Sequence, residues 1–170
     1  NLINAREGTN LSFTPNIQVP TGDYLVSFTF GFDDEDNIDG AYPELNQTEE
    51  GPWGVPAQLG GGYHYMQFDG KYKDTNNLNA NFNYHVIRAV DRTEPMNLKF
   101  EDTSFTVDLG SIEIKENASI EIKMNIAEWF TNPNTWDLNT LNSELMANFE
   151  AQKQMSANGK TVFSLGEITP

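Results

Sequence analysis

Hydrophobic and polar residues alternate along most of the chain, and this alternation is typical of β-strands that bury one face. The clearest case runs from Tyr24 to Phe32, where Val26, Phe28 and Phe30 share one face and polar residues dominate the other. Asn, Asp, Gly and Pro separate the alternating segments, as expected of turns. The pattern therefore predicts a chain built mainly from strands.

The segment Ser119–Ile126 shows the same period, with its isoleucines and methionine on one face and charged residues on the other. A spacing closer to that of a helix appears only late, over Leu141–Ser156. The predicted strands are Leu11–Val19, Tyr24–Phe32, Tyr63–Phe68, Asn81–Val90, Leu98–Phe100, Ser104–Asp108, Ser111–Ile114, Ser119–Ile126 and Thr161–Leu165.

Strands of this length, with frequent turn signals and one late helix, favour an all-β fold: an antiparallel β-sandwich with one C-terminal helix. The 170 residues contain no internal repeat and no linker that would separate two folding units. We therefore expect residues 1–170 to form a single domain.

The formal net charge of −15 excludes some partners. Such a charge repels phosphate backbones and anionic lipid surfaces, so we expect no nucleic-acid partner. No apolar run reaches the length of a membrane span, so we expect no transmembrane segment in this chain. The chain has no cysteine, which excludes disulfides and thiolate chemistry.

A long segment between the predicted strands, residues 33–59, is rich in acidic residues and in Gly and Pro. Asp34, Asp36 and Asp39 are candidate calcium ligands because Ca²⁺ prefers several oxygen ligands from a flexible loop. Their spacing departs from the EF-hand pattern, and a solvated turn is the alternative. Trp53 lies in the same segment, where its ring could cover the sandwich edge, bind the face of a sugar, or approach the histidines.

The two histidines of the chain, His64 and His85, fall on the two strands of one predicted hairpin. A symmetric hairpin that pairs Phe68 with Asn81 sets the histidines opposite each other, with Cβ atoms about 5 Å apart. Two imidazoles at that spacing can share a metal ion such as copper, zinc, iron or nickel. Met66, two residues after His64, is expected on the same face, where its thioether could join the site or simply pack in the core.

The alternative is that both histidines are packed, hydrogen-bonded strand residues without a metal. Catalytic signatures are absent from the sequence: it contains no Gly-x-Ser-x-Gly elbow, phosphate-binding loop or HExxH motif. We therefore expect that the protein is not an enzyme.

The order of several short motifs resembles the MbnP-like (methanobactin-associated) family of bacterial copper-binding proteins. The motifs that carry this resemblance are Gly22-Asp23-Tyr24, Tyr42-Pro43-Glu44-Leu45-Asn46, Gly61-Gly62-Tyr63-His64-Tyr65-Met66, Phe82-Asn83-Tyr84-His85 and Asn125-Ile126-Ala127-Glu128-Trp129-Phe130. Together with Asn158-Gly159 ahead of Val162-Phe163-Ser164-Leu165, they extend over nearly the whole chain.

The resemblance implies a β-sandwich protein that is exported, either to the periplasm or to the cell surface as a lipoprotein. Some relatives bind copper through two histidines and a tryptophan oxidised to kynurenine, which places His64, His85 and Trp53 in those roles here. The resemblance also implies that N-terminal strands of the full-length protein are missing, which would leave an unpaired sheet edge.

Two functional hypotheses follow from the sequence. The first is an extracytoplasmic copper-binding or copper-handling protein, with His64 and His85 as ligands and Trp53 or Met66 completing or shielding the site. The second is a metal-free bacterial surface lipoprotein that binds a protein partner or a glycan through residues 33–59, with Trp53 as an aromatic platform.

Overall fold

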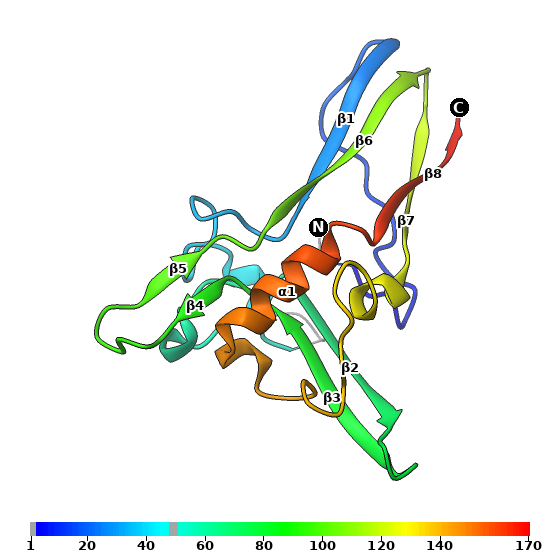
Figure 1. Cartoon of the computed structure of the whole chain (residues 1–170). Helices are drawn as coiled ribbons and strands as arrows, with labels where there is room; N and C mark the ends of the chain where they lie inside the picture. Colours follow the sequence, from blue (N-terminus) through cyan, green and yellow to red (C-terminus); the bar gives the residue numbers. More distant parts are fainter. Residues whose placement is uncertain (1–2, 48–50) are drawn as a thin grey trace.

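The structure is a computed structural model that describes residues 3–47 and 51–170. Strands in these ranges form antiparallel pairs, which project from the region around a central helix (Figure 1). The pairs are β1 (Gly22–Phe30) with β6 (Phe105–Ile114), β2 (Met66–Lys73) with β3 (Asn79–Val86), β4 (Ala89–Asp91) with β5 (Lys99–Glu101), and β7 (Ser119–Met124) with β8 (Phe163–Thr169).

The helix α1 spans Phe149–Gly159, close to the C-terminal end of the chain. Short 3₁₀ helices lie in the connections: η1 (Pro43–Gln47), η2 (Ala57–Leu59), η3 (Ile126–Phe130) and η4 (Leu145–Ala147). This arrangement confirms the predicted all-β class with one helix near the C-terminus, and its antiparallel sheets agree with a β-sandwich. In the ranges that the structure describes, no helix has both the length and the apolar character needed to span a bilayer.

The hydrophobic core is dominated by aromatic rings. Trp129 and Tyr84 are almost fully buried, and the ring of Tyr84 packs against those of Trp129, Phe130 and Trp136. Met155 of α1 is fully buried in the same cluster. The core thus joins α1 to β3 and to the segment that follows β7, and large rings supply most of the buried apolar area.

The alternation in Tyr24–Phe32 is confirmed as β1, which begins and ends two residues earlier than predicted. Its partner β6 is one continuous strand where the sequence indicated two, Ser104–Asp108 and Ser111–Ile114. A bulge explains the apparent break: Val26 pairs with Gly110 and Ser27 with Asp108, so Leu109 has no partner. Gly110 has a φ of 79°, which suits a glycine at such a bulge.

The predicted strand Leu11–Val19 is wrong, because these residues form no strand and expose their apolar side chains. Pro15 lies within the segment and Pro20 follows it, and neither can donate a backbone hydrogen bond to a neighbouring strand. Alternation alone does not make a strand when the segment forms no backbone pairing with another of the described strands.

Other boundaries also differ from the prediction, including β2, which begins at Met66 rather than Tyr63, and β5, which is shifted by one residue. The helix begins at Phe149 rather than Leu141, because Asn148 caps it by accepting a hydrogen bond from the Ala151 N–H. The segment Ser119–Ile126 forms β7 only as far as Met124, because Asn125 caps η3 and Ile126 begins it. Ile122 and Met124 are 44% and 37% exposed, so the predicted buried face is largely open. The last strand, β8, begins two residues later than predicted and extends to Thr169.

The predicted strand Asn81–Val90 is divided into β3 and β4 by Ile87 and Arg88. The backbone groups of Ile87 bond to side chains there instead of to a neighbouring strand. Its N–H donates to Gln152 Oε1 at 2.8 Å, and its carbonyl accepts from Thr103 Oγ1 at 2.7 Å. These side-chain bonds satisfy the buried backbone while the chain turns from one sheet into the next.

Candidate metal centre

His64 lies in an extended segment just before β2 and is only 6% exposed. Its backbone N–H donates to the Trp53 carbonyl at 2.8 Å, next to the isolated bridge between Gly54 and Tyr63. On the other side, the Tyr65 N–H donates to the Val86 carbonyl at 2.8 Å. The segment that carries His64 is therefore held between the Trp53 loop and the end of β3.

Asn37, from the acidic segment, fixes the residues on both sides of His64. Its Oδ1 accepts from the Tyr63 N–H at 2.8 Å, and its Nδ2 donates to the Tyr65 hydroxyl at 3.2 Å. Gly62 makes this approach possible: a Cβ at that position would lie 2.2 Å from Asn37 Oδ1. Asn37 is 3% exposed, so these bonds are shielded from water.

The predicted pairing of His64 with His85 is wrong, because β2 and β3 pair Met66 with Val86 and Gln67 with His85. The turn is centred further along the chain than a symmetric hairpin about Phe68 and Asn81 required. Asp74 sets its position, since Asp74 Oδ1 accepts from the N–H groups at 76 and 78. Asn77 takes a left-handed φ of 62° inside the turn, a conformation that asparagine tolerates.

Despite this shift in register, the two imidazole rings meet. Their centroids are 5.4 Å apart and the ring planes are nearly perpendicular, at 82°. Strict alternation would place His64 on the core side with Met66, but Tyr65 and Met66 both contact the core cluster. The alternation thus breaks at these two residues, and His64 lies on the side of His85.

Each ring has one nitrogen bound to an oxygen acceptor. His64 Nδ1 lies 2.9 Å from the Trp53 carbonyl, and His85 Nε2 lies 3.0 Å from Asp69 Oδ1. A carbonyl or a carboxylate can only accept, so these two nitrogens carry the protons. In the neutral rings, the lone pairs available to a metal are therefore on His64 Nε2 and His85 Nδ1.

The buried position of His64 favours the neutral form of its ring. Burial is the largest effect, and it lowers the pKa of His64 below the usual 6.5; the hydrogen bond to Trp53 opposes this shift. The neighbouring His85 lowers the pKa further, while the carboxylate of Asp69 opposes it. A neutral imidazole is the form that coordinates metals.

A methionine does contact His64, but it is Met146 and not Met66. Met146 Sδ lies 3.1 Å from His64 Nε2, whereas Met66 packs against the core cluster. Met146 belongs to η4, which Gln152 of α1 ties to β3. Gln152 Nε2 donates to the carbonyls of His85 and Leu145, at 2.9 and 3.0 Å.

Trp53 reaches the histidines through its backbone, since its carbonyl accepts both the N–H and the ring Nδ1 of His64. Its indole Nε1 is buried and has no hydrogen-bond partner among the described residues. The Gln67 side chain, on the same face of the hairpin as His85, donates to the Pro52 carbonyl at 3.1 Å. The Trp53 loop is therefore fastened beside both rings.

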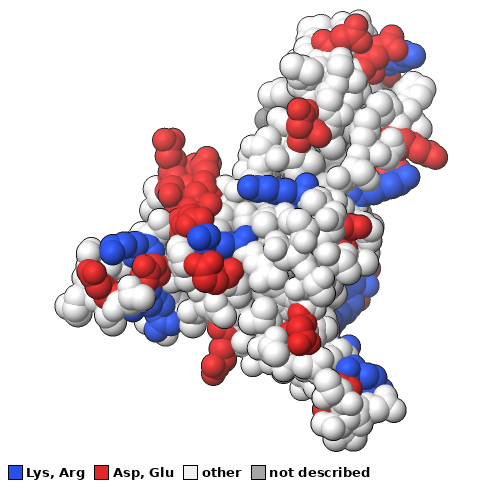
Figure 2. Space-filling view, viewed as in Figure 1, with Lys and Arg blue, Asp and Glu red and all other residues white. Residues whose placement is uncertain are grey.

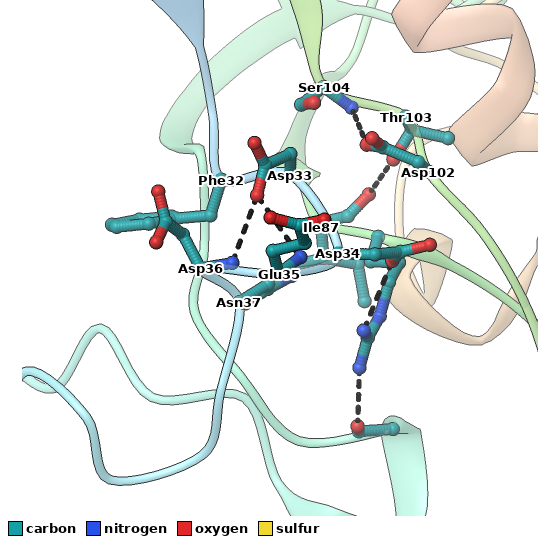
Figure 3. A network of polar contacts seen from close by, with 12 residues as sticks. Phe32, Asp33, Asp34, Glu35, Asp36, Asn37, Ile87, Asp102, Thr103 and Ser104 are labelled. Atoms are coloured by element: carbon teal, nitrogen blue, oxygen red, sulfur yellow. Dashed lines mark hydrogen bonds and ion pairs between the residues drawn. The ribbon is translucent and has the colours of Figure 1, made fainter.

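The candidate calcium ligands are not brought together. Asp34 forms an ion pair with Arg88 at 3.2 Å, and Figure 3 shows Asp36 directed away from that pair. Asp33 Oδ1 accepts from the N–H groups of Glu35 and Asp36, which closes a local turn. Between residues 3 and 47 and from 51 onward, no group of three or more His, Asp or Glu side chains could hold a metal ion. This arrangement gives no support to the calcium prediction.

Sequence reasoning missed four residues that build the site: Asn37, Asp69, Met146 and Gln152. Asp69 lies within the predicted hairpin turn, so an acceptor close to a histidine could have been suspected from the sequence. The other three come from distant segments, and no local pattern connects them to His64 or His85. Acidic side chains also spread over several of the projecting strand pairs, on the face seen in Figure 2, instead of gathering at one place.

The comparison with family models finds MbnP, which matches residues 1–148. This range includes both histidines, Trp53 and Met146, and ends just before α1. No curated protein and no solved structure matches the chain. The MbnP family is associated with methanobactin and with copper. Because the match extends over most of its length, the chain belongs to the MbnP family.

Proposed function

We propose that this protein is an extracytoplasmic copper-binding or copper-handling protein whose site is built on His64 and His85. The observation that carries the proposal is the contact between the two rings, with centroids 5.4 Å apart. Membership of a copper-associated family supports copper as the metal. The proposal includes export to the periplasm or to the cell surface as a lipoprotein, and it includes no catalytic turnover.

The residues around the rings fit a copper ion. Imidazole nitrogen is a good ligand for copper, and each ring leaves one unprotonated nitrogen for it. The second nitrogen of each ring donates a hydrogen bond. His64 Nδ1 donates to the Trp53 carbonyl at 2.9 Å, and His85 Nε2 donates to Asp69 Oδ1 at 3.0 Å. Outer hydrogen bonds of this kind orient metal-binding histidines and raise their basicity.

The surrounding residues shield the His64 side of the site from water and leave the His85 side partly open. His64 is 6% exposed, whereas the His85 side chain is 19% exposed, so an ion would approach from the side of His85. The net charge of −15 raises the local concentration of cations and favours their arrival. Trp53, whose indole Nε1 is buried without a partner among the residues that the structure describes, would shield the site or be modified beside it.

Copper titration of the purified protein tests the proposal, with competition against a chelator to remove weakly bound ions. The wild type is expected to retain one equivalent of copper, and the double variant His64→Ala, His85→Ala none. Asn81→Ala is the matched control, because Asn81 is an exposed residue on the same strand and face as His85 but is not a proposed ligand. Circular dichroism checks that each variant is folded.

Retention of one equivalent by the folded double variant would contradict the two-histidine site, and so would a wild type that retains none. Mass spectrometry of the peptide that contains Trp53 tests its modification. Addition of oxygen, or conversion to kynurenine, is expected after exposure to copper and an oxidant. Fractionation of the native host, followed by immunodetection, tests the extracytoplasmic location.

A further inference from the structure

Three consecutive glycines, Gly60–Gly62, lead directly into the segment that carries His64. All three have left-handed φ values, from 66° to 106°. Glycine has more backbone freedom to lose on folding than any other residue, so this run is costly to hold in one conformation. The position of His64 therefore depends on contacts that fix the two ends of the glycine run.

Arg88 holds the first end of the run. Its Nη2 donates to the Gly60 carbonyl at 3.3 Å, and its Nη1 donates to Asp34 Oδ1 at 3.2 Å. The guanidinium also lies over the Phe100 ring, with Cζ 4.2 Å from the ring centroid. The side chain of Arg88 is only 13% exposed. A planar guanidinium with partners at its edge and an aromatic ring against its face has a fixed orientation.

The second end of the run is held from the acidic segment that Arg88 also contacts. Asn37 lies three residues after Asp34, and its side chain accepts from the Tyr63 N–H at 2.8 Å. Arg88 therefore acts on the glycine run twice, once directly at Gly60 and once through Asp34 and Asn37. Both ends of the run are thus fixed relative to one guanidinium.

Arg88 belongs to the same stretch of chain as His85. It lies three residues after His85, in the break between β3 and β4. The Ile87 backbone in this break is fixed by the side chains of Gln152 and Thr103. The guanidinium therefore joins a fixed part of the His85 segment to the glycine run.

We propose that Arg88 is a positioning residue of the His64–His85 site, which fixes the glycine run so that the two rings meet before an ion arrives. This inference rests on the proposed function and extends it, because it states how the metal-free protein keeps the site assembled. Arg88 is not a ligand, and its positive charge repels a cation. Any gain in copper affinity that it brings therefore comes from geometry.

The test compares Arg88→Gln with wild type and with Arg92→Gln, which removes the same charge from an exposed position after β4. Loss of a positive charge by itself favours cation binding, so charge alone predicts slightly tighter binding of copper in both variants. Positioning predicts the opposite for Arg88→Gln only. We expect its copper affinity, measured by chelator competition, to fall by about tenfold. The affinity of Arg92→Gln is expected to stay within about twofold of wild type.

A second measurement uses the metal-free protein, in which NMR detects nuclear Overhauser effects between the ring protons of His64 and His85. Wild type and Arg92→Gln are expected to show them, because the ring centroids are 5.4 Å apart. Arg88→Gln is expected to weaken or lose them while circular dichroism shows that it is folded. A general loss of stability would not separate two rings within the folded protein.

Arg88→Lys covers the case in which Arg88→Gln does not fold. Lysine keeps the positive charge, but its ammonium group lacks the planar fork that reaches both Gly60 and Asp34. Its copper affinity is expected to lie between those of wild type and Arg88→Gln. If Arg88→Gln does not fold, Arg88→Lys carries the comparison, and wild-type behaviour in either measurement then overturns the proposal.

The positioning role and the proposed function fail in different ways. If folded Arg88→Gln keeps either the ring contact or the copper affinity of wild type, Arg88 has no positioning role and the two-histidine site stands. Absence of the ring contact in metal-free wild type would overturn the preassembled site. If wild type retains no copper, the proposed function fails, and the NMR comparison still decides whether Arg88 positions the rings.

Discussion

At the scale of single residues, backbone carbonyls and carboxylates decide what the histidines can do. The Trp53 carbonyl accepts both the N–H and the ring Nδ1 of His64, so one group fixes the main chain and the ring together. Asp69 acts on His85 in a similar way, and it also accepts from the Asn83 side chain. The oxygen acceptors beside the two rings, one from the backbone and one from a side chain, therefore determine which ring nitrogens are free.

Replacement of Asp69 by Ala is expected to lower copper affinity about 10- to 100-fold, the usual cost of losing an outer hydrogen-bond partner of a metal-binding histidine. Glu116→Ala is the matched control, because it removes the same charge from an exposed position in the turn between β6 and β7. Chelator competition measures both affinities. Equal losses in the two variants would mean that Asp69 acts through net charge and not through His85.

Gly62→Ala is expected to destabilise the fold more than Gly40→Ala. Both glycines have left-handed φ values, 77° and 75°, so both substitutions carry a backbone cost of about 1–2 kcal/mol. Only at Gly62 would the new Cβ displace Asn37, whose bonds to Tyr63 and Tyr65 would be lost at about 1 kcal/mol each. Urea unfolding should show a difference of about 2 kcal/mol; equal costs would rule out the steric explanation.

At the scale of elements, one side chain of α1 joins three separate segments. Gln152 accepts from the Ile87 N–H and donates to the carbonyls of His85 and Leu145. These groups belong to the end of β3, to the break before β4, and to η4. The helix thus serves as a clamp behind the candidate site, although it lies beyond the residues that match the family model.

Gln152→Met is expected to destabilise the protein by about 2 kcal/mol or more, because it leaves the buried Ile87 N–H unpaired and removes a donor from the His85 carbonyl, while the Leu145 carbonyl keeps its bond from the Asn148 N–H. Gln154→Met, on the same helix, is the control: Gln154 has a single long bond to the Thr135 carbonyl at 3.4 Å. Its cost should stay below about 1 kcal/mol. Chemical unfolding followed by circular dichroism measures both, and similar values for the two variants would contradict the clamp.

At the scale of the whole molecule, the buried tyrosines of the aromatic core make the stability of the fold decrease at alkaline pH. Burial raises the pKa of Tyr84 well above its usual value of 10, and it does the same for Tyr65. The Tyr84 hydroxyl donates to the Trp129 carbonyl at 3.0 Å, deep in the core. Because both pKa values are higher in the folded state, their contribution to stability is complete below about pH 10 and is lost as pH rises above it.

Each such tyrosine is expected to remove about 1.4 kcal/mol of unfolding free energy for every pH unit above about 10. Tyr84→Phe should therefore weaken this dependence by about that amount, even if the variant is less stable overall. Tyr24→Phe, in which an exposed hydroxyl is lost, is the control. Urea unfolding at several pH values from about 9 to about 11.5 measures the dependence, and an unchanged slope in Tyr84→Phe would contradict it.

Alternation of apolar side chains correctly located β1 and β7, because a period of two belongs to the extended backbone itself, even where the apolar face stays largely open, as in β7. It failed at Leu11–Val19, where no neighbouring strand completes the pairing. It also failed for the register of β2 and β3, because Asp74 and Asn77 set the position of the turn. Strand pairing and register depend on which strands are neighbours and on the geometry of the turns. An alternating pattern in one segment gives no information on either.

The sequence by itself determined the all-β class, the late helix, the two histidines as a candidate pair, and the family. These properties follow from which residues are present and from the local spacing of apolar side chains. Only the tertiary structure decided that the rings meet at 5.4 Å despite a shifted register, and that Met146 rather than Met66 lies at His64. The physical reason is that these contacts join segments as far apart as His64 and Met146, and only the packing of core, turn and helix brings such segments together.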